Sequence, residues 1–135
     1  MSHQLTFDHL VNYDPGHPGI SVTVTLETYG ASVSCEAKLD SGSSFCIFSR
    51  KTGEELGLEV EAGIRRIVGT VTGSFAVYLH EVNLSIAGCS FTVLVGFAED
   101  AIVQRNVLGR RGFLEQVILG LIDYEGKLYL GAYGQ

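Results

Sequence analysis

Hydrophobic and polar residues alternate in two stretches near the start of the chain. In the run Ile20-Ser21-Val22-Thr23-Val24-Thr25-Leu26, the even positions are apolar and the odd positions carry hydroxyl groups. From Val33 to Asp40 the odd positions are apolar instead. Alternation with a period of two is typical of a strand with one buried face. The pattern therefore predicts two strands joined by a turn at Tyr29-Gly30, and it places Asp40 on the polar face at the end of the second strand.

Most of the remaining chain also carries strand signals, which are short apolar or alternating runs separated by glycine-containing turns. The segments 64–71 and 74–79 flank Thr72-Gly73, and together they predict a hairpin that the glycines at 69 and 73 would make mobile. The other expected strands cover residues 45–48, 78–86, 91–97, 117–124 and 127–130.

Two short segments carry helix signals. Ser49 is a favourable N-cap for a helix that runs to Leu56, and Gly57 follows where helices often take a left-handed residue. A second signal, which begins next to a glycine, covers residues 111–117. Both segments are short, so strands are expected to dominate the fold.

The size and composition of the chain fit one globular domain. Its 135 residues match the usual size of a single domain, and 46% hydrophobic against 18% charged residues allows an ordinary core. We expect a mainly-β domain over residues 20–131, built as a closed or strongly curved sheet with one or two short helices. A lead-in containing both prolines precedes it over residues 1–19, and a tail follows over residues 132–135.

Charge and residue usage argue against several classes of function. A net charge of -6 disfavours a general nucleic-acid surface, which needs a clustered positive field. No apolar run approaches the roughly 20 residues that span a bilayer, and no secretory signal is expected at the N-terminus. The histidines lack a metal-ligand spacing, and the three widely spaced cysteines Cys35, Cys46 and Cys89 favour a reduced, cytoplasmic setting. No metal or other cofactor is expected.

The residues best suited to chemistry follow the second predicted strand. The run Leu39-Asp40-Ser41-Gly42-Ser43 brings together a carboxylate, two hydroxyl groups and a glycine. Taken alone, Asp-Ser-Gly at a strand end is most often a hydrogen-bonded turn. A serine nucleophile is disfavoured, because both the trypsin-type Gly-Asp-Ser-Gly-Gly context and a Gly-x-Ser-x-Gly elbow are missing from the sequence.

Together with later features, this turn resembles the active site of the retropepsin-like aspartic proteases, the single-domain relatives of pepsin and of the retroviral proteases. The hairpin lies where that family has a flap, with Gly69, Thr70, Val71, Thr72 and Gly73 as the flap candidates. The family's hydrophobic-hydrophobic-glycine-arginine element, which a short helix follows, is similar to Val107, Leu108, Gly109 and Arg110. The resemblance extends over roughly residues 20–131 and implies the closed barrel of that family.

The resemblance also implies an aspartic endopeptidase with Asp40 as its catalytic residue. Such enzymes need two carboxylates that share one proton. Because the chain has one Asp-Ser-Gly and cannot hold the two lobes of pepsin, the active form would be a homodimer with one Asp40 from each protomer. Its substrate would be a peptide or protein in extended conformation.

The resemblance assigns supporting roles to the neighbours of Asp40. Ser41 would hydrogen-bond across the dimer axis, the Gly42 amide would donate to Asp40, and Ser43 would donate a further hydrogen bond to the dyad. The segment from Gly126 to Leu130 would pair with its partner in the dimer. The family usually has an acidic or amide residue after the arginine, whereas Arg111 follows here, so the ion-pair partner of that arginine is not defined by the sequence.

Two alternatives remain open at this point. The same fold can serve as a catalytically silent peptide-binding or dimerisation module that captures an extended peptide without cutting it. A β-barrel that binds a small apolar ligand would leave Asp40 without a role.

Overall fold

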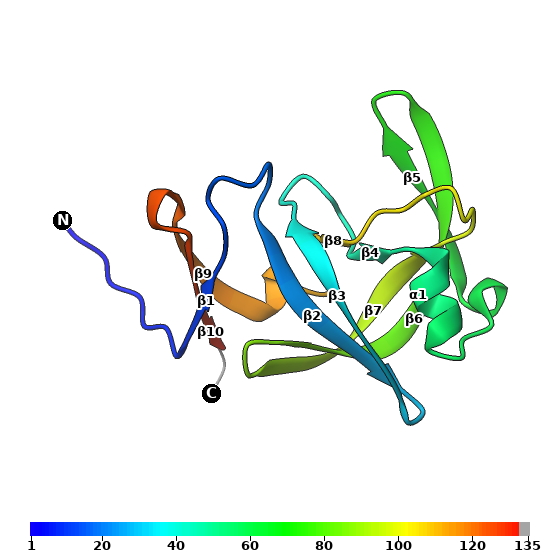
Figure 1. The fold of residues 1–135 in the computed structure, drawn as a ribbon, viewed down its shortest axis with the longest axis horizontal. Helices are drawn as coiled ribbons and strands as arrows, with labels where there is room; N and C mark the ends of the chain where they lie inside the picture. The colour runs from blue at the N-terminus through cyan, green and yellow to red at the C-terminus, as the bar shows by residue number, and fades with distance from the viewer. Residues whose placement is uncertain (133–135) are drawn as a thin grey trace.

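The structure is a computed structural model that describes residues 1–132, and strands make up most of it (Figure 1). One α-helix, α1 (Arg50–Glu55), and three single 3-10 turns at Val60–Ala62, Leu114–Gln116 and Asp123–Glu125 complete the regular structure of these residues. The strands are β1 (His9–Asn12), β2 (Ser21–Thr28), β3 (Ala31–Leu39), β4 (Ile47–Phe48), β5 (Ile64–Thr70), β6 (Gly73–Ile86), β7 (Cys89–Ala98), β8 (Val107–Leu108), β9 (Val117–Ile122) and β10 (Lys127–Ala132).

The larger sheet closes on itself. Its seven strands lie in the order β2-β3-β8-β4-β7-β6-β5, and β2 pairs a second time with β6, where Leu26 lies opposite Leu84. This additional pairing joins the end strand β2 to β6, the last strand but one, and β5 extends beyond the closed part of the sheet. The prediction of a mainly-β, closed or strongly curved sheet is confirmed. The predicted phase of the first two strands also holds, because Val22, Val24 and Leu26 of β2 are buried.

A second, three-stranded sheet joins the two ends of the chain. Its order is β1-β10-β9, with His9 of β1 opposite Leu130 of β10. The sequence patterns did not predict β1, which lies inside the segment expected to be a lead-in. A further hydrogen bond holds the same segment in place, because the backbone N–H of Tyr13 donates to the Gly126 carbonyl at 2.9 Å.

The position of β10 corrects one expectation. We expected Gly126 to Leu130 to pair with a partner chain, but β10 is the central strand of this sheet and both of its edges bond within the chain. Its backbone donors and acceptors are therefore already used. The outer strands of the sheet are β1 and β9.

Of the two predicted helices, the first forms and the second is reduced to one turn. In α1, the Ser49 side chain accepts from the Thr52 backbone N–H at 3.3 Å, and Gly57 follows with a φ of +79°. The expected helix over residues 111–117 is wrong, since only a 3-10 turn forms at Leu114–Gln116. Gly112 takes a φ of +96° and directs the following Phe113 into the core, which leaves too few residues for a helix before β9 begins.

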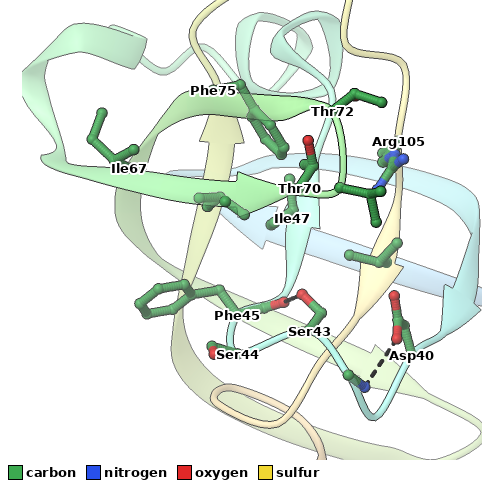
Figure 2. A pocket seen from close by; sticks show the side chains of 15 residues that line it. Asp40, Ser43, Ser44, Phe45, Ile47, Ile67, Thr70, Thr72, Phe75 and Arg105 are labelled. Carbon is green, nitrogen blue, oxygen red and sulfur yellow. Dashed lines mark hydrogen bonds between the residues drawn. The ribbon is translucent and has the colours of Figure 1, made fainter.

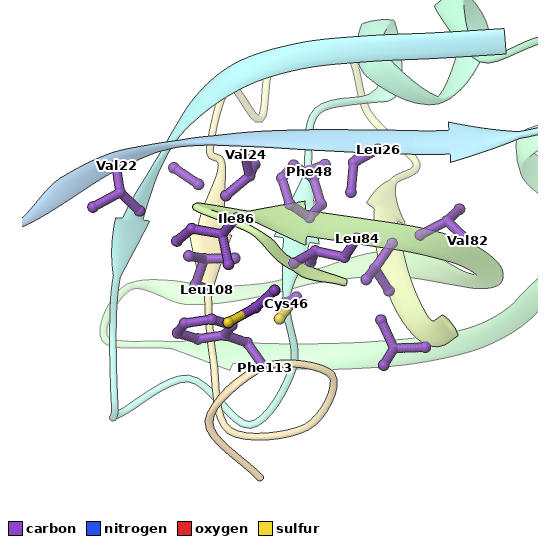
Figure 3. Close-up of a cluster of buried hydrophobic side chains, with 14 of the residues drawn as sticks. Val22, Val24, Leu26, Cys46, Phe48, Val82, Leu84, Ile86, Leu108 and Phe113 are labelled. Carbon is purple, nitrogen blue, oxygen red and sulfur yellow. The ribbon is translucent and has the colours of Figure 1, made fainter. Parts of the chain in front are cut away.

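The main core is enclosed largely by the curved larger sheet (Figure 3), and Val117, Leu128 and Leu130 of the smaller sheet join the same cluster. Large side chains from distant segments are completely buried there, and each contributes roughly 1.5–3 kcal/mol to stability by leaving water. They include Leu26, Phe48, Leu84, Leu108 and Phe113. The core thereby fixes β3, β4 and β8 against one another, and these strands carry the residues of the candidate site.

Within residues 1–132, no helix has the length and apolar character needed to cross a membrane. The same residues contain no cluster of three or more His, Cys, Asp or Glu side chains that could hold a metal ion.

Candidate active site

Asp40 begins a tight turn directly after β3. Its backbone N–H donates to the Leu108 carbonyl at 2.9 Å, and its own carbonyl accepts from the Ser43 N–H at 3.1 Å. The Gly42 N–H donates to Asp40 Oδ1 at 2.9 Å, as the dashed line in Figure 2 marks. A Cβ at Gly42 would lie only 3.2 Å from that oxygen, so glycine suits this close approach. The half-buried carboxylate is thus held by the backbone of its own turn.

The predicted glycine-arginine element lies beside this turn. Strand β8 pairs in parallel with β3, so Leu108 lies opposite Leu39. The N–H of Arg110 donates to the Ser43 carbonyl at 2.9 Å. A Cβ at Gly109 would overlap the Phe45 carbonyl oxygen and lie 2.6 Å from that of Ser43. The element therefore packs against the Asp40 turn, and the space at position 109 accommodates only a glycine.

The two serines of the turn differ in their contacts. Ser43 Oγ donates to the Phe45 carbonyl at 2.7 Å, so here it stabilises the loop and not the carboxylate, unlike the role the resemblance implied. Ser41 is exposed at the tip of the turn. A bond from Ser41 across a dimer axis requires a second chain, so that role stays a prediction.

A cavity of about 490 Å³ separates the Asp40 turn from the β5–β6 hairpin, which projects from the body of the molecule (Figures 1 and 2). Four of the five flap candidates line it together with Asp40, and they are Gly69, Thr70, Val71 and Thr72. The fifth, Gly73, lines a neighbouring hollow that shares Thr70 and Thr72 with this cavity. Val107 also lines the cavity, whereas Leu108, Gly109 and Arg110 are not among its described lining residues.

Several cavity residues were not among the predicted site residues. Apolar walls come from Phe45, Ile47, Ile67 and Phe75, and the loop between β7 and β8 contributes Arg105. One signal in the sequence points to Arg105, because side chains two positions apart in an extended segment face the same way and Val107 was already a candidate.

Comparison with known proteins agrees with this geometry. A family model described as aspartyl protease matches residues 22–121, which include the Asp40 turn, the hairpin and the glycine-arginine element. The chain belongs to the aspartyl protease family. Among solved structures, the EIAV protease complexed with the inhibitor HBY-793 is similar, with a TM-score of 0.56 and 16% sequence identity. The match covers 74% of this chain and 88% of that chain, and it shows a shared retropepsin-like fold. No curated protein sequence matches significantly.

In this member of the family, the cysteine nearest to the site is unsuited to act as a nucleophile. Cys46 is completely buried, and its Sγ accepts from the Gly109 N–H at 3.4 Å. Burial raises the pKa of the Cys46 thiol to about 12, although the bond from Gly109 acts in the opposite direction. The thiol is therefore protonated at neutral pH, and the buried Cys46 offers no thiolate nucleophile to the site.

The face of the molecule next to the turn carries two arginines. Arg110 and Arg111 line a hollow of about 340 Å³ together with Ser41, Ser44 and Glu115. Within residues 1–132, the side chains of both arginines lack ion-pair partners. The acidic partner that the family usually supplies to Arg110 is thus missing from the described part of this protomer.

Proposed function

We propose that the protein is an aspartic endopeptidase whose active form is a homodimer with one Asp40 from each protomer at its two-fold axis. The observation that carries this proposal is the Asp40 carboxylate, held by the Gly42 N–H at the edge of a cavity that the β5–β6 hairpin covers. A single protomer supplies one such carboxylate, while the chemistry needs two that share a proton. The membership in the aspartyl protease family supports the reaction class.

In the proposed reaction, the ionised Asp40 takes a proton from a water molecule as the water oxygen attacks the peptide carbonyl carbon. The protonated Asp40 of the partner subunit donates its proton to the carbonyl oxygen. When the tetrahedral gem-diol intermediate collapses, the C–N bond breaks, the leaving nitrogen receives a proton from the dyad, and one hydroxyl of the intermediate returns its proton to the dyad as the C=O bond of the new carboxyl group forms. Water is thereby added across the peptide bond, and the dyad again holds one proton.

The cavity walls suit an extended peptide. The side chains of Ile47, Ile67 and Phe75 offer apolar contacts, and the hairpin strands lie above the Asp40 turn (Figure 2). We therefore propose apolar side chains on at least one side of the cleaved bond. The three unpaired cysteines support the proposal of a cytoplasmic setting.

The first prediction concerns Asp40→Asn, which keeps the shape of the side chain but removes its acid-base function. Cleavage of a peptide library or of a denatured protein should fall by roughly 10²–10⁴-fold or more, because general acid-base catalysis is lost at both positions of the dyad. Asp8→Asn is the matched control, since Asp8 is exposed and lies outside the cavity. Products are quantified by mass spectrometry, and dimer content is measured by sedimentation.

Wild-type rates in Asp40→Asn at equal dimer content would overturn the mechanism. A wild-type protein that forms dimers and binds peptides but cleaves none of them would instead be a silent peptide-binding module.

A further inference from the structure

Arg105 provides the positive charge in the Asp40 cavity. Among the residues that line this cavity, it is the only base and Asp40 is the only acid. Arg105 lies in the loop between β7 and β8, two residues before Val107, which lines the same cavity. Figure 2 shows Arg105 beside the hairpin tip, close to Thr72 and on the same side of the cavity as Asp40. A peptide held under the hairpin would therefore meet this guanidinium.

The guanidinium of Arg105 is not engaged by the protein. It forms no hydrogen bond or ion pair with any residue of the described range 1–132, whereas Arg50 binds Glu54 and Glu61. An arginine side chain carries five N–H donors in a planar fork, which matches the two oxygens of a carboxylate. Its hydrogen-bonding capacity is thus available to a ligand.

Substrate binding would change the surroundings of this charge. Arg105 is exposed in the free protein and also lines the neighbouring hollow. A peptide that fills the cavity displaces part of the water around the guanidinium, and a charged group that loses water without gaining an acceptor is destabilised. Apart from the Asp40 carboxylate, the described residues of the other walls offer only apolar side chains, hydroxyl groups and backbone. A carboxylate on the peptide is the group that would best replace the lost water.

The dimensions of the cavity place that carboxylate near the cleaved bond. A volume of about 490 Å³ corresponds to a sphere roughly 10 Å across. An extended peptide advances about 3.3 Å per residue, so the side chain that reaches Arg105 lies within about three residues of the bond above Asp40.

We propose that Arg105 determines specificity by selecting substrates with an aspartate or glutamate within about three residues of the cleaved bond. This inference rests on the proposed peptidase function, because it assigns a substrate class to the same cavity. In a homodimer, two copies of Arg105 would flank the two Asp40 carboxylates, so that acidic residues on either side of the bond are accepted.

The second prediction tests this selectivity with matched peptides that differ only by Glu, Gln or Lys near the cleaved bond. Wild type should cleave Glu peptides roughly tenfold faster than Gln peptides, as expected for one charge-assisted hydrogen bond. Arg105→Met, which keeps an unbranched side chain close to the length of the aliphatic part of arginine but removes the guanidinium, should bring this ratio to about one. Arg105→Glu should favour Lys, and Arg105→Lys should keep part of the preference for Glu.

The matched control is Arg66→Met on strand β5. Arg66 is exposed and lies outside the cavity, and among residues 1–132 its side chain donates only to the carbonyl of Arg65. Its replacement removes the same charge from the protein, so the Glu-to-Gln ratio should not change. In wild type the ratio should also fall as the pH drops below about 4.3, because the substrate glutamate then becomes neutral.

Peptide binding to Asp40→Asn, with and without Arg105→Met, separates this inference from the proposed reaction. Cleavage without preference for Glu would overturn the role of Arg105 and leave the peptidase intact. Binding that prefers Glu and depends on Arg105, in a wild-type protein that cleaves nothing, would support Arg105 and overturn the peptidase. If neither cleavage nor Arg105-dependent binding is found, both proposals are wrong.

Discussion

Gly109 shows at the scale of one residue how the site depends on backbone packing. Its neighbours at the Cβ position are the carbonyl oxygens of Phe45 and Ser43, and neither can rotate away as a side chain would. Ser43 closes the turn that holds the Asp40 carboxylate, and Phe45 lies two residues further along the chain. Crowding at Gly109 is therefore transmitted to the group proposed for catalysis.

The third prediction is that Gly109→Ala lowers both stability and activity. The added methyl must displace the Ser43–Phe45 backbone, at a cost of about 1–3 kcal/mol or more in the free energy of unfolding. Urea denaturation measures this loss, and peptide cleavage under native conditions should fall further than the remaining folded fraction explains. For stability, Gly69→Ala is the control, because a Cβ there would meet nothing within 4 Å. Equal stability of Gly109→Ala and wild type would contradict the close packing.

At the scale of elements, sequence patterns correctly predicted the strands and the helix whose structure depends on residues close together in the chain. The phase of β2 and β3 follows from their alternation, and the Ser49 cap and Gly57 define α1. Strand β1 could not be predicted in this way, because its four residues are stabilised by β10, more than a hundred positions away. Non-local pairing of this kind leaves little trace in a short window of sequence.

The candidate site was predictable in part for the same reason. Asp40 and the hairpin follow from strand ends and turns, and the resemblance located the glycine-arginine element. The role of Ser43 depended on the path of the loop after it, which periodicity does not define. Arg105 depended on the pairing of β8 with β3, which brings its loop to the cavity.

A side-chain hydrogen bond also ties the N-terminal segment to the β9–β10 turn. Tyr13 Oη donates to Asp123 Oδ1 at 2.6 Å. This bond, with smaller contributions from desolvation and the Asp123 charge, raises the pKa of Tyr13 from 10.0 to about 12. Because the folded-state pKa is above the unfolded one, the stabilisation is complete below pH 10 and is lost as the pH rises toward 12.

The fourth prediction follows from the raised pKa of Tyr13. Between pH 10 and 12, the melting temperature of wild type should fall more steeply than that of Tyr13→Phe, which lacks the bond at every pH. Tyr124→Phe, an exposed tyrosine in the same turn, serves as the control and should follow wild type. Thermal scans monitored by circular dichroism measure the three curves, and identical slopes for wild type and Tyr13→Phe would contradict the assignment.

At the scale of the whole molecule, the sheet arrangement changes how dimerisation can be tested. Truncation after Tyr124 would remove β10, whose Leu128 and Leu130 are completely buried, so it would damage the core as well as any interface. A test that leaves each protomer intact is therefore needed. Mixing active and inactive protomers provides one, because the proposed site takes one Asp40 from each chain.

The fifth prediction is that excess Asp40→Asn protein inhibits wild type by forming mixed dimers. After subunit exchange, random pairing with a ninefold excess leaves wild-type homodimers at about one tenth of their original amount, and activity should fall to that level. Asp8→Asn protein is the control, since it contributes an intact Asp40 and should not inhibit. Activity that is unaffected by Asp40→Asn, when mass spectrometry shows that mixed dimers have formed, would contradict a shared dyad. Such a result would mean that each protomer cleaves peptides with its own residues.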